Sequence, residues 1–269
     1  MIEAVQRMPT PARWPWLSSL PILALAGCAA LEEEPRLGAE ERGSVVKAAS
    51  FSRAPASGKP PPGWQPWIIL RSKPLTRYAL VENHGKTVLR AEARTSASGL
   101  YREIHVNPRR HPILAWRWRV DAPVPGADPR QRATEDAPAR VLVAFTGDRD
   151  RLDFGERTNM ALAKALSGQQ LPYATLMYIW SEQLPVGTVV RNPHTSRIQM
   201  IVAASGPVRP GAWTALERNV AEDYRRVFGE EPGDIHAVGV MTDTDNTAGE
   251  AVAYYGDIAF RRRPAAAAR

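Results

Sequence analysis

The region from Trp67 to Arg261 is a succession of short segments rich in β-branched, aromatic and aliphatic residues, and this pattern constrains the fold most. Turn-forming residues such as Asn83-His84-Gly85 and Pro232-Gly233 separate the segments. Many short strands with regular turns predict a mostly β protein, either a β-sandwich or a jelly roll. The expected strands are 67–71, 77–83, 86–94, 100–106, 113–120, 140–146, 174–181, 197–204, 213–218, 235–242 and 252–261.

Two segments predict short helices instead of strands. They are residues 156–166, which are rich in alanine, and residues 220–228. Each is followed closely by a glycine, Gly168 or Gly229, and glycine commonly ends a helix. We therefore expect a sandwich with two short helices.

Residues 114–120 form the clearest strand, because apolar and polar side chains alternate along it. Trp116 and Trp118 share a face with the apolar residues at both ends, which favours a core role over a sugar-stacking platform. Arg117 and Arg119 share the opposite face. Two guanidiniums on one face suit an anionic ligand or a pair of carboxylates, although a solvated face with ordinary ion pairs is the alternative.

The densest polar cluster is the loop Asp243-Thr244-Asp245-Asn246, directly after an apolar strand. Its oxygens could ligate a hard cation, but the loop lacks the glycine and glutamate that an EF-hand requires. A turn capped by Asp and Asn side chains is one alternative. Acid–base chemistry is another, since Asp243 and Asp245 would lie about 7 Å apart on one strand face. Asp136, in an acidic loop shortly before Arg140, joins these candidates.

The single cysteine, Cys28, follows a segment of signal-peptide type. Two arginines precede an apolar stretch, residues 14–26, and small residues stand before the cysteine. The arrangement resembles the bacterial lipoprotein signal, which implies cleavage after residue 27 and acylation of the Cys28 thiol. Ala29 in place of an aspartate implies sorting to the outer membrane. We therefore expect a lipid-anchored protein on the periplasmic side of the outer membrane.

We predict four parts in the chain. They are a signal peptide at 1–27, a lipid-anchored flexible tether at 28–66, the β-sandwich at 67–261 and a disordered basic tail at 262–269. The formal net charge is +7, and four arginines lie among the last nine residues. A solvated tail is favoured over a binding patch for these arginines. We do not expect nucleic acid as a partner, because an exported protein rarely meets it.

Several longer motifs resemble one bacterial family of uncharacterised proteins, the domain-of-unknown-function family 3047. The motifs lie between about residues 67 and 260, and include Tyr173-Ala174-Thr175-Leu176-Met177-Tyr178-Ile179-Trp180 and Phe228-Gly229-Glu230-Glu231-Pro232. This resemblance implies no activity and no catalytic residues. A shorter motif, Tyr255-Gly256-Asp257-Ile258-Ala259-Phe260, is similar to the last strand of galactose-binding-like jelly rolls. That second resemblance implies a structural calcium ion with Asp257 as a ligand.

Taken together, these patterns favour a non-catalytic protein that binds a glycan or another cell-envelope polymer. The expected groove uses Arg117, Arg119, Arg140, Asp136, Asp243, Asp245 and Asn246. Two alternatives stay open: an envelope scaffold or assembly lipoprotein, and a glycan-active hydrolase with a pair of carboxylates among Asp136, Asp243 and Asp245. The sequence assigns no catalytic residue, because its five histidines lack metal-ligand spacing and no nucleophile or phosphate-loop motif occurs.

Overall fold

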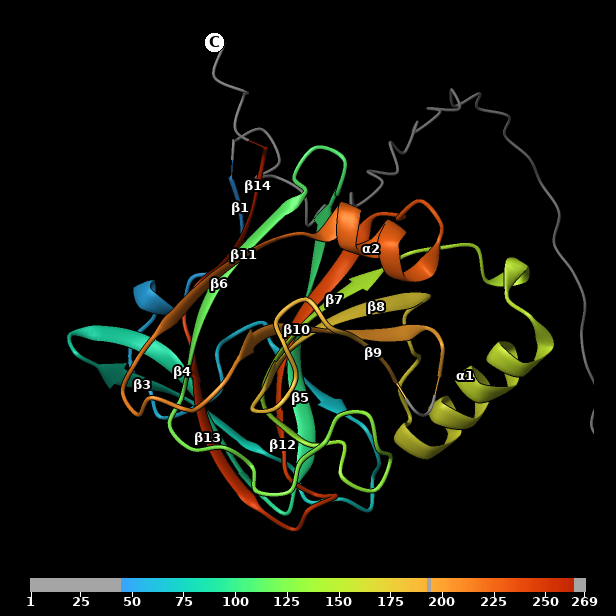
Figure 1. The fold of residues 1–269 in the computed structure, drawn as a ribbon. Coiled ribbons are helices and arrows are strands. Elements are labelled where there is room, and N and C mark those ends of the chain that lie inside the picture. The colour runs from blue at the N-terminus through green and yellow to red at the C-terminus, as the bar shows by residue number, and fades with distance from the viewer. Residues whose placement is uncertain (1–44, 193–194, 264–269) are drawn as a thin grey trace, which may run out of the picture. The chain divides into compact units, whose positions relative to one another are not determined.

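The computed structural model describes residues 45–192 and 195–263, which form two β-sheets packed face to face (Figure 1). Sheet A contains β1 (Val45–Ala49), β3 (Arg77–Asn83), β4 (Lys86–Arg94), β6 (Ile113–Val120), β11 (Thr214–Asn219), β13 (Glu250–Tyr255) and β14 (Ile258–Arg261). Sheet B contains β2 (Gln65–Ile68), β5 (Ala97–Val106), β7 (Ala137–Phe145), β8 (Ala174–Ser181), β9 (Val189–Arg191), β10 (Ile198–Ser205) and β12 (Ile235–Asp243). The prediction of a mostly β sandwich is confirmed.

The strand order brings distant segments of the chain together. Sheet A runs β1-β14-β6-β13-β4-β3, with β11 also paired to β6, and sheet B runs β2-β5-β12-β7-β8-β10-β9. Neighbouring strands are antiparallel except β8 and β10, which run parallel. The central strands β7 and β8 are buried on both faces, so each sheet B strand there has an inner face toward sheet A and an outer face covered by other parts of the chain.

The main core fills the space between the inner faces of the two sheets. Trp116 and Trp118 from sheet A lie there with Tyr178 from sheet B. The Trp116 ring centroid is 5.2 Å from that of Tyr178 and 5.6 Å from that of Trp118. Such aromatic contacts bury a large apolar area and add a preferred ring geometry. The core role expected for both tryptophans is confirmed.

Both predicted helices are present, as α1 (Phe154–Ser167) and α2 (Val220–Phe228). The Asp153 side chain accepts a hydrogen bond from the backbone of Glu156 and so moves the start of α1 two residues ahead of the prediction. Two 3-10 turns, Phe51–Arg53 and Arg149–Arg151, complete the helical elements. Within the described part of the chain, no helix is long and apolar enough to span a membrane.

The structure corrects the predicted domain boundary at Trp67, because residues 45–66 belong to the folded domain rather than to a tether. Strand β1 pairs with β14, and its Val46 and Ala48 side chains are buried. The sequence pattern does not reveal β1, because this strand has only five residues and its surroundings are polar and rich in proline. Its pairing with β14, which is far away in the sequence, stabilises it. Residues 1–44, and with them Cys28, lie outside the described residues, as do residues 264–269 of the predicted tail.

Candidate functional site

A buried ion network occupies one end of the outer face of sheet B. The Arg140 guanidinium lies on this face, since its neighbours Ala139 and Val141 point into the main core. Its Nε and Nη2 donate to the two carboxylate oxygens of Asp243, each at 2.8 Å. Its Nη1 and Nη2 also donate to the side chain and backbone carbonyl of Glu135, at 2.9 and 2.8 Å. Arg140 is therefore held from the end of β12 and from the loop before β7.

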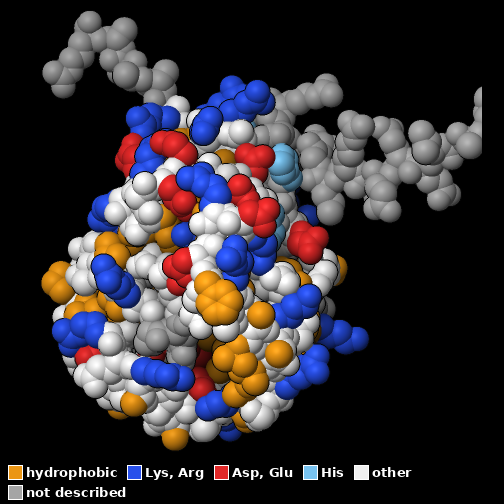
Figure 2. Space-filling model, turned by 90° about the vertical axis from the view of Figure 1, so that its right-hand side faces the viewer, with side chains coloured by type: hydrophobic (Ala, Val, Ile, Leu, Met, Phe, Trp, Pro, Cys, Tyr) orange, Lys and Arg blue, Asp and Glu red, His pale blue; other side chains and the backbone are white. Residues whose placement is uncertain are grey.

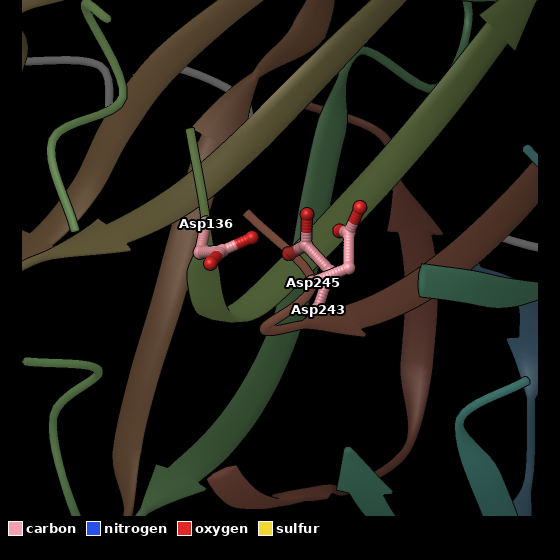
Figure 3. Close-up of side chains that lie close together, drawn as sticks. All are labelled: Asp136, Asp243 and Asp245. Atoms are coloured by element: carbon pink, nitrogen blue, oxygen red, sulfur yellow. The ribbon is translucent and has the colours of Figure 1, made fainter. Parts of the chain in front are cut away.

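The other acidic side chains of the predicted groove gather around this network (Figure 3). Asp136 accepts hydrogen bonds from the Thr247 amide and hydroxyl, each at 2.7 Å, and from the Asn246 amide at 3.2 Å. Asp245 forms an ion pair of 2.9 Å with Lys73. The structure thus brings together Arg140, Asp136, Asp243 and Asp245, as the sequence predicted, and Asn246 contributes its backbone.

The charges of this cluster do not balance. Four carboxyl groups face only two cations, Arg140 and Lys73. The carboxyl groups are those of Glu135, Asp136, Asp243 and Asp245. Burial raises the pKa of Asp243 to about 7; Arg140 opposes this shift, whereas Glu135 and Asp136 add to it. For Arg140, burial lowers the pKa, but Asp243 and Glu135 outweigh that effect and leave it raised. The guanidinium therefore stays charged, and the Asp243 carboxyl holds a proton to higher pH than an exposed aspartate does.

The spacing of the three aspartates resembles a cation site, because one oxygen of each lies within 4.8 Å of the others. Their oxygens, however, are already bound within the protein, by Arg140 at Asp243, by Lys73 at Asp245 and by loop amides at Asp136. A calcium ion would displace these donors and add charge beside a buried guanidinium. The donor set therefore does not fit calcium, and the network instead joins the loop after β12 to the start of β7.

The remaining predicted groove residues lie elsewhere. Arg117 and Arg119 are on the outer face of sheet A, so the structure does not join them to Arg140 in one groove. Arg119 stacks on Tyr254, with its guanidinium carbon 3.8 Å from the ring centroid, and Arg117 stacks on Trp213 at 4.6 Å. The predicted calcium ligand Asp257 is exposed and accepts hydrogen bonds from the Ser52 amide and hydroxyl, at 2.9 and 2.5 Å.

A hollow of about 300 Å³ lies on the outer face of sheet B and was not expected from the sequence. Its floor is made of small side chains at matching positions of neighbouring strands, namely Ala237, Ala144 and Thr175. Trp67 and Tyr101 stand beside this floor and are each half-buried. We call this hollow the sheet B pocket. It adjoins the ion network, since Leu142 in its lining is two residues from Arg140.

Four large polar side chains also line the sheet B pocket: Glu103, Gln169, Gln170 and His236. His236 is an extra residue of β12 relative to β7, a bulge that changes the direction in which its side chain points. Burial lowers the pKa of His236, with Glu103 acting in the opposite direction. The imidazole is therefore neutral at pH 7 and can both donate and accept a hydrogen bond.

The position of Trp67 depends on a glycine across the strand pair. Trp67 on β2 lies opposite Gly99 on β5. A Cβ atom at Gly99 would lie 2.8 Å from the Val240 carbonyl oxygen and 3.1 Å from the Trp67 ring. Only glycine permits this close approach, which lets the indole lie against the sheet at the edge of the sheet B pocket. Gln169 fixes the same strand by binding the Ile68 amide and the Pro66 carbonyl, each at 2.9 Å.

These features define a β-sandwich protein with an aromatic-lined hollow on one sheet. The chain belongs to the DUF3047 family, whose model, "Protein of unknown function (DUF3047)", matches residues 62–259. The expected family resemblance is thereby confirmed. A search of curated proteins gave no match.

Several solved structures are similar in fold. The family 11 carbohydrate-binding module of the cellulase Lic26A-Cel5E of Clostridium thermocellum is 6% identical, with a TM-score of 0.41 and coverage of 82% of this chain and 99% of that chain. The xyloglucanase domain of NopAA from Sinorhizobium fredii is 7% identical, with a TM-score of 0.40 and coverage of 78% and 97%. The CBM22-1 xylan-binding domain of Paenibacillus barcinonensis Xyn10C is 13% identical, with a TM-score of 0.36 and coverage of 82% and 98%. At these values the similarity carries no statement about a ligand.

Proposed function

We propose that this domain is a non-catalytic carbohydrate-binding module and that the sheet B pocket holds the sugar. The observation that carries the proposal is the placement of Trp67 and Tyr101 beside a floor of small residues, in a hollow of about 300 Å³. A pyranose ring has apolar C–H faces and a polar rim. Aromatic rings can stack on those faces, while Glu103, Gln169 and His236 supply hydrogen bonds to hydroxyl groups.

The composition of the lining favours binding over hydrolysis. Glycoside hydrolysis commonly requires two carboxyl groups flanking the scissile bond. Among the described residues that line the sheet B pocket, Glu103 is the one carboxylate. The aspartates of the ion network are bound to Arg140, Lys73 and loop amides, which supports a structural role for them. This is evidence against the hydrolase alternative.

A binding experiment tests the proposal. Titration of the purified protein with soluble hexasaccharides of glucose, xylose and N-acetylglucosamine should quench tryptophan fluorescence for at least one of them. Trp67→Ala and Tyr101→Ala should each weaken that binding at least tenfold, by removing a stacking surface. Trp213→Ala, which removes a half-buried tryptophan that lies just before β11 and stacks with Arg117, is the matched control and should bind normally. Equal binding by all three variants would refute this site. If the natural protein bound none of the glycans, the scaffold alternative would remain.

We further propose that the protein is attached to the periplasmic face of the outer membrane through an acylated Cys28. The support is the lipoprotein-type sequence before that cysteine. Labelling of bacterial cells with palmitate should mark the protein, and Cys28→Ser should abolish the label and release the protein from the membrane fraction. A Cys28→Ser protein that keeps both the label and its location would contradict the proposal.

A further inference from the structure

A second hollow, of about 600 Å³, lies where the start of α2 meets the end of β14. Five arginines line it: Arg109, Arg110, Arg225, Arg262 and Arg263. The lining residues include no aspartate or glutamate. We call this site the arginine hollow. It is separate from the sheet B pocket and from the ion network, with which it shares no residue.

The protein neutralises only part of this charge. Arg225 pairs with Glu231 at 2.7 Å, and Arg263 pairs with Glu222. Arg110 and Arg262 form no ion pair with any described residue, and both are exposed. Like charges this close repel one another, and an anion in the hollow would relieve the repulsion. A guanidinium presents a planar set of donors that matches the oxygens of a phosphate group.

Arg109 and Arg110 stand on a turn that the fold supports, and Arg225 stands on α2. The Asn107 side chain accepts hydrogen bonds from the backbone amides of Arg109 and Arg110, at 2.9 and 3.2 Å. The Val220 amide at the start of α2 donates to the Pro112 carbonyl at 2.8 Å and so joins the helix to this turn. The positive end of the α2 dipole lies at the hollow and adds to the attraction for an anion.

The position of the arginine hollow indicates which phosphate-bearing molecule it binds. Val45, the first described residue, lies opposite Arg261 in the β1–β14 pair, beside Arg262 and Arg263. The two strands appear together at the top of Figure 1, and Figure 2 shows basic side chains mixed with acidic ones at that end of the molecule. Cys28 precedes Val45 by 17 positions, so a lipid on Cys28 could lie no more than about 60 Å away. The chain therefore enters the described domain at Val45, beside the arginine hollow.

We propose that the arginine hollow binds the phosphate groups of anionic lipid headgroups and so holds the domain against a membrane surface. The phosphate chemistry follows from the arginines themselves and does not require acylation of Cys28. The proposal that the sheet B pocket binds a glycan is also independent of lipid binding, since a glycan can bind there whether or not the domain touches lipid.

Vesicle sedimentation tests the proposal on the full chain carrying Cys28→Ser, which removes the acylation site. We expect binding to vesicles that contain phosphatidylglycerol and weak binding to vesicles of phosphatidylcholine alone. The double variant Arg110→Gln/Arg262→Gln should weaken binding to the anionic vesicles about thirtyfold, because each basic side chain at an anionic surface contributes roughly fivefold. Both arginines are exposed and unpaired, so the fold should survive, and an unchanged Tm verifies this.

The control is Arg132→Gln/Arg157→Gln, which removes the same charge from exposed positions in other parts of the domain. Equal losses in the two double variants would overturn the proposal, because only net charge would matter. Full binding by Arg110→Gln/Arg262→Gln would also overturn it. Titration with glycerol phosphate forms a second arm: arginine-dependent binding of this soluble compound, without a preference for anionic vesicles, would overturn the assignment of lipid as the source of the phosphate.

Discussion

Arg140 on β7 and Asp243 on β12 are joined across neighbouring strands by two parallel hydrogen bonds of 2.8 Å each, with both side chains almost fully buried. Glu135 binds the same guanidinium from the loop before β7. The pair joins β7 to the end of β12, and Leu142, the next outward-facing residue of β7 after Arg140, lines the sheet B pocket. The ion network therefore supports the proposed binding surface without touching the sugar.

Replacing Arg140 should be strongly destabilising. Arg140→Met would leave the carboxylates of Asp243 and Glu135 buried without their cation, and we expect a loss of about 3–5 kcal/mol in the free energy of unfolding. Urea denaturation near pH 7.5 measures this loss. Arg119→Met is the matched control: Arg119 is also buried, but its partner Asp121 is more exposed, so the cost should be smaller. A cost below about 1 kcal/mol for Arg140→Met would mean that the network contributes no more than a surface ion pair.

The pKa of Asp243 predicts the direction of a pH effect. In the folded protein it is raised to about 7, mainly by burial, whereas an unfolded aspartate titrates near ~4. The folded state therefore holds a proton that the unfolded state has released. The resulting stability is fully present below about pH 4 and is lost as the pH rises to about 7.

Comparison with Asp243→Asn isolates this contribution, because the amide does not titrate. The free energy of unfolding of the natural protein, minus that of Asp243→Asn, should fall between pH 4 and pH 7 and then level off. Urea titrations across this range measure the difference. A difference that stays constant or rises with pH would show that Arg140 lowers the pKa of Asp243 at least as much as burial raises it.

The sequence predicts the inner faces of the sandwich better than its outer faces. The alternation around Trp116 and Trp118 is sufficient to place both in the core, because a strand has only two faces. The same alternation puts Arg117 and Arg119 on the outward face but cannot say which sheet they belong to. Strand order places them on a different sheet from Arg140, and strand order depends on contacts between distant segments.

The sequence predicts the candidate site only where the polar residues of the site lie close together in the sequence. The acidic loop around Asp243 and Asp245 stands out by composition, and the structure brings Asp136 to it. The sheet B pocket has no such signal, since its floor consists of small residues that lie on separate strands and meet only through register. Tyr101 and His236 become recognisable as a pair only once β5 and β12 are known to be neighbours.

Calcium should have no effect on the stability of the domain. The oxygens of the three clustered aspartates are bound by Arg140, Lys73 and loop amides, and Asp257 binds Ser52. We therefore expect the same Tm in calcium and in EDTA. A rise in Tm with calcium would contradict this assignment; if Asp245→Asn then removed the rise and Asp257→Asn did not, the ion would lie in the cluster.

Filling the sheet B pocket should abolish glycan binding without loss of the fold. Ala144 lies on the floor of the hollow, where the side chain of Ala144→Leu would extend into open space rather than into the main core. We expect a change of less than about 1.5 kcal/mol in the free energy of unfolding, because the added atoms meet a cavity. Affinity for the glycan that binds the natural protein should fall at least tenfold, as measured by fluorescence titration.

Ala161→Leu on the exposed face of α1 adds the same atoms at a distant position and should leave affinity unchanged. Normal binding by a folded Ala144→Leu protein would move the site away from this hollow, whereas a loss in both variants would indicate a general effect of added apolar surface.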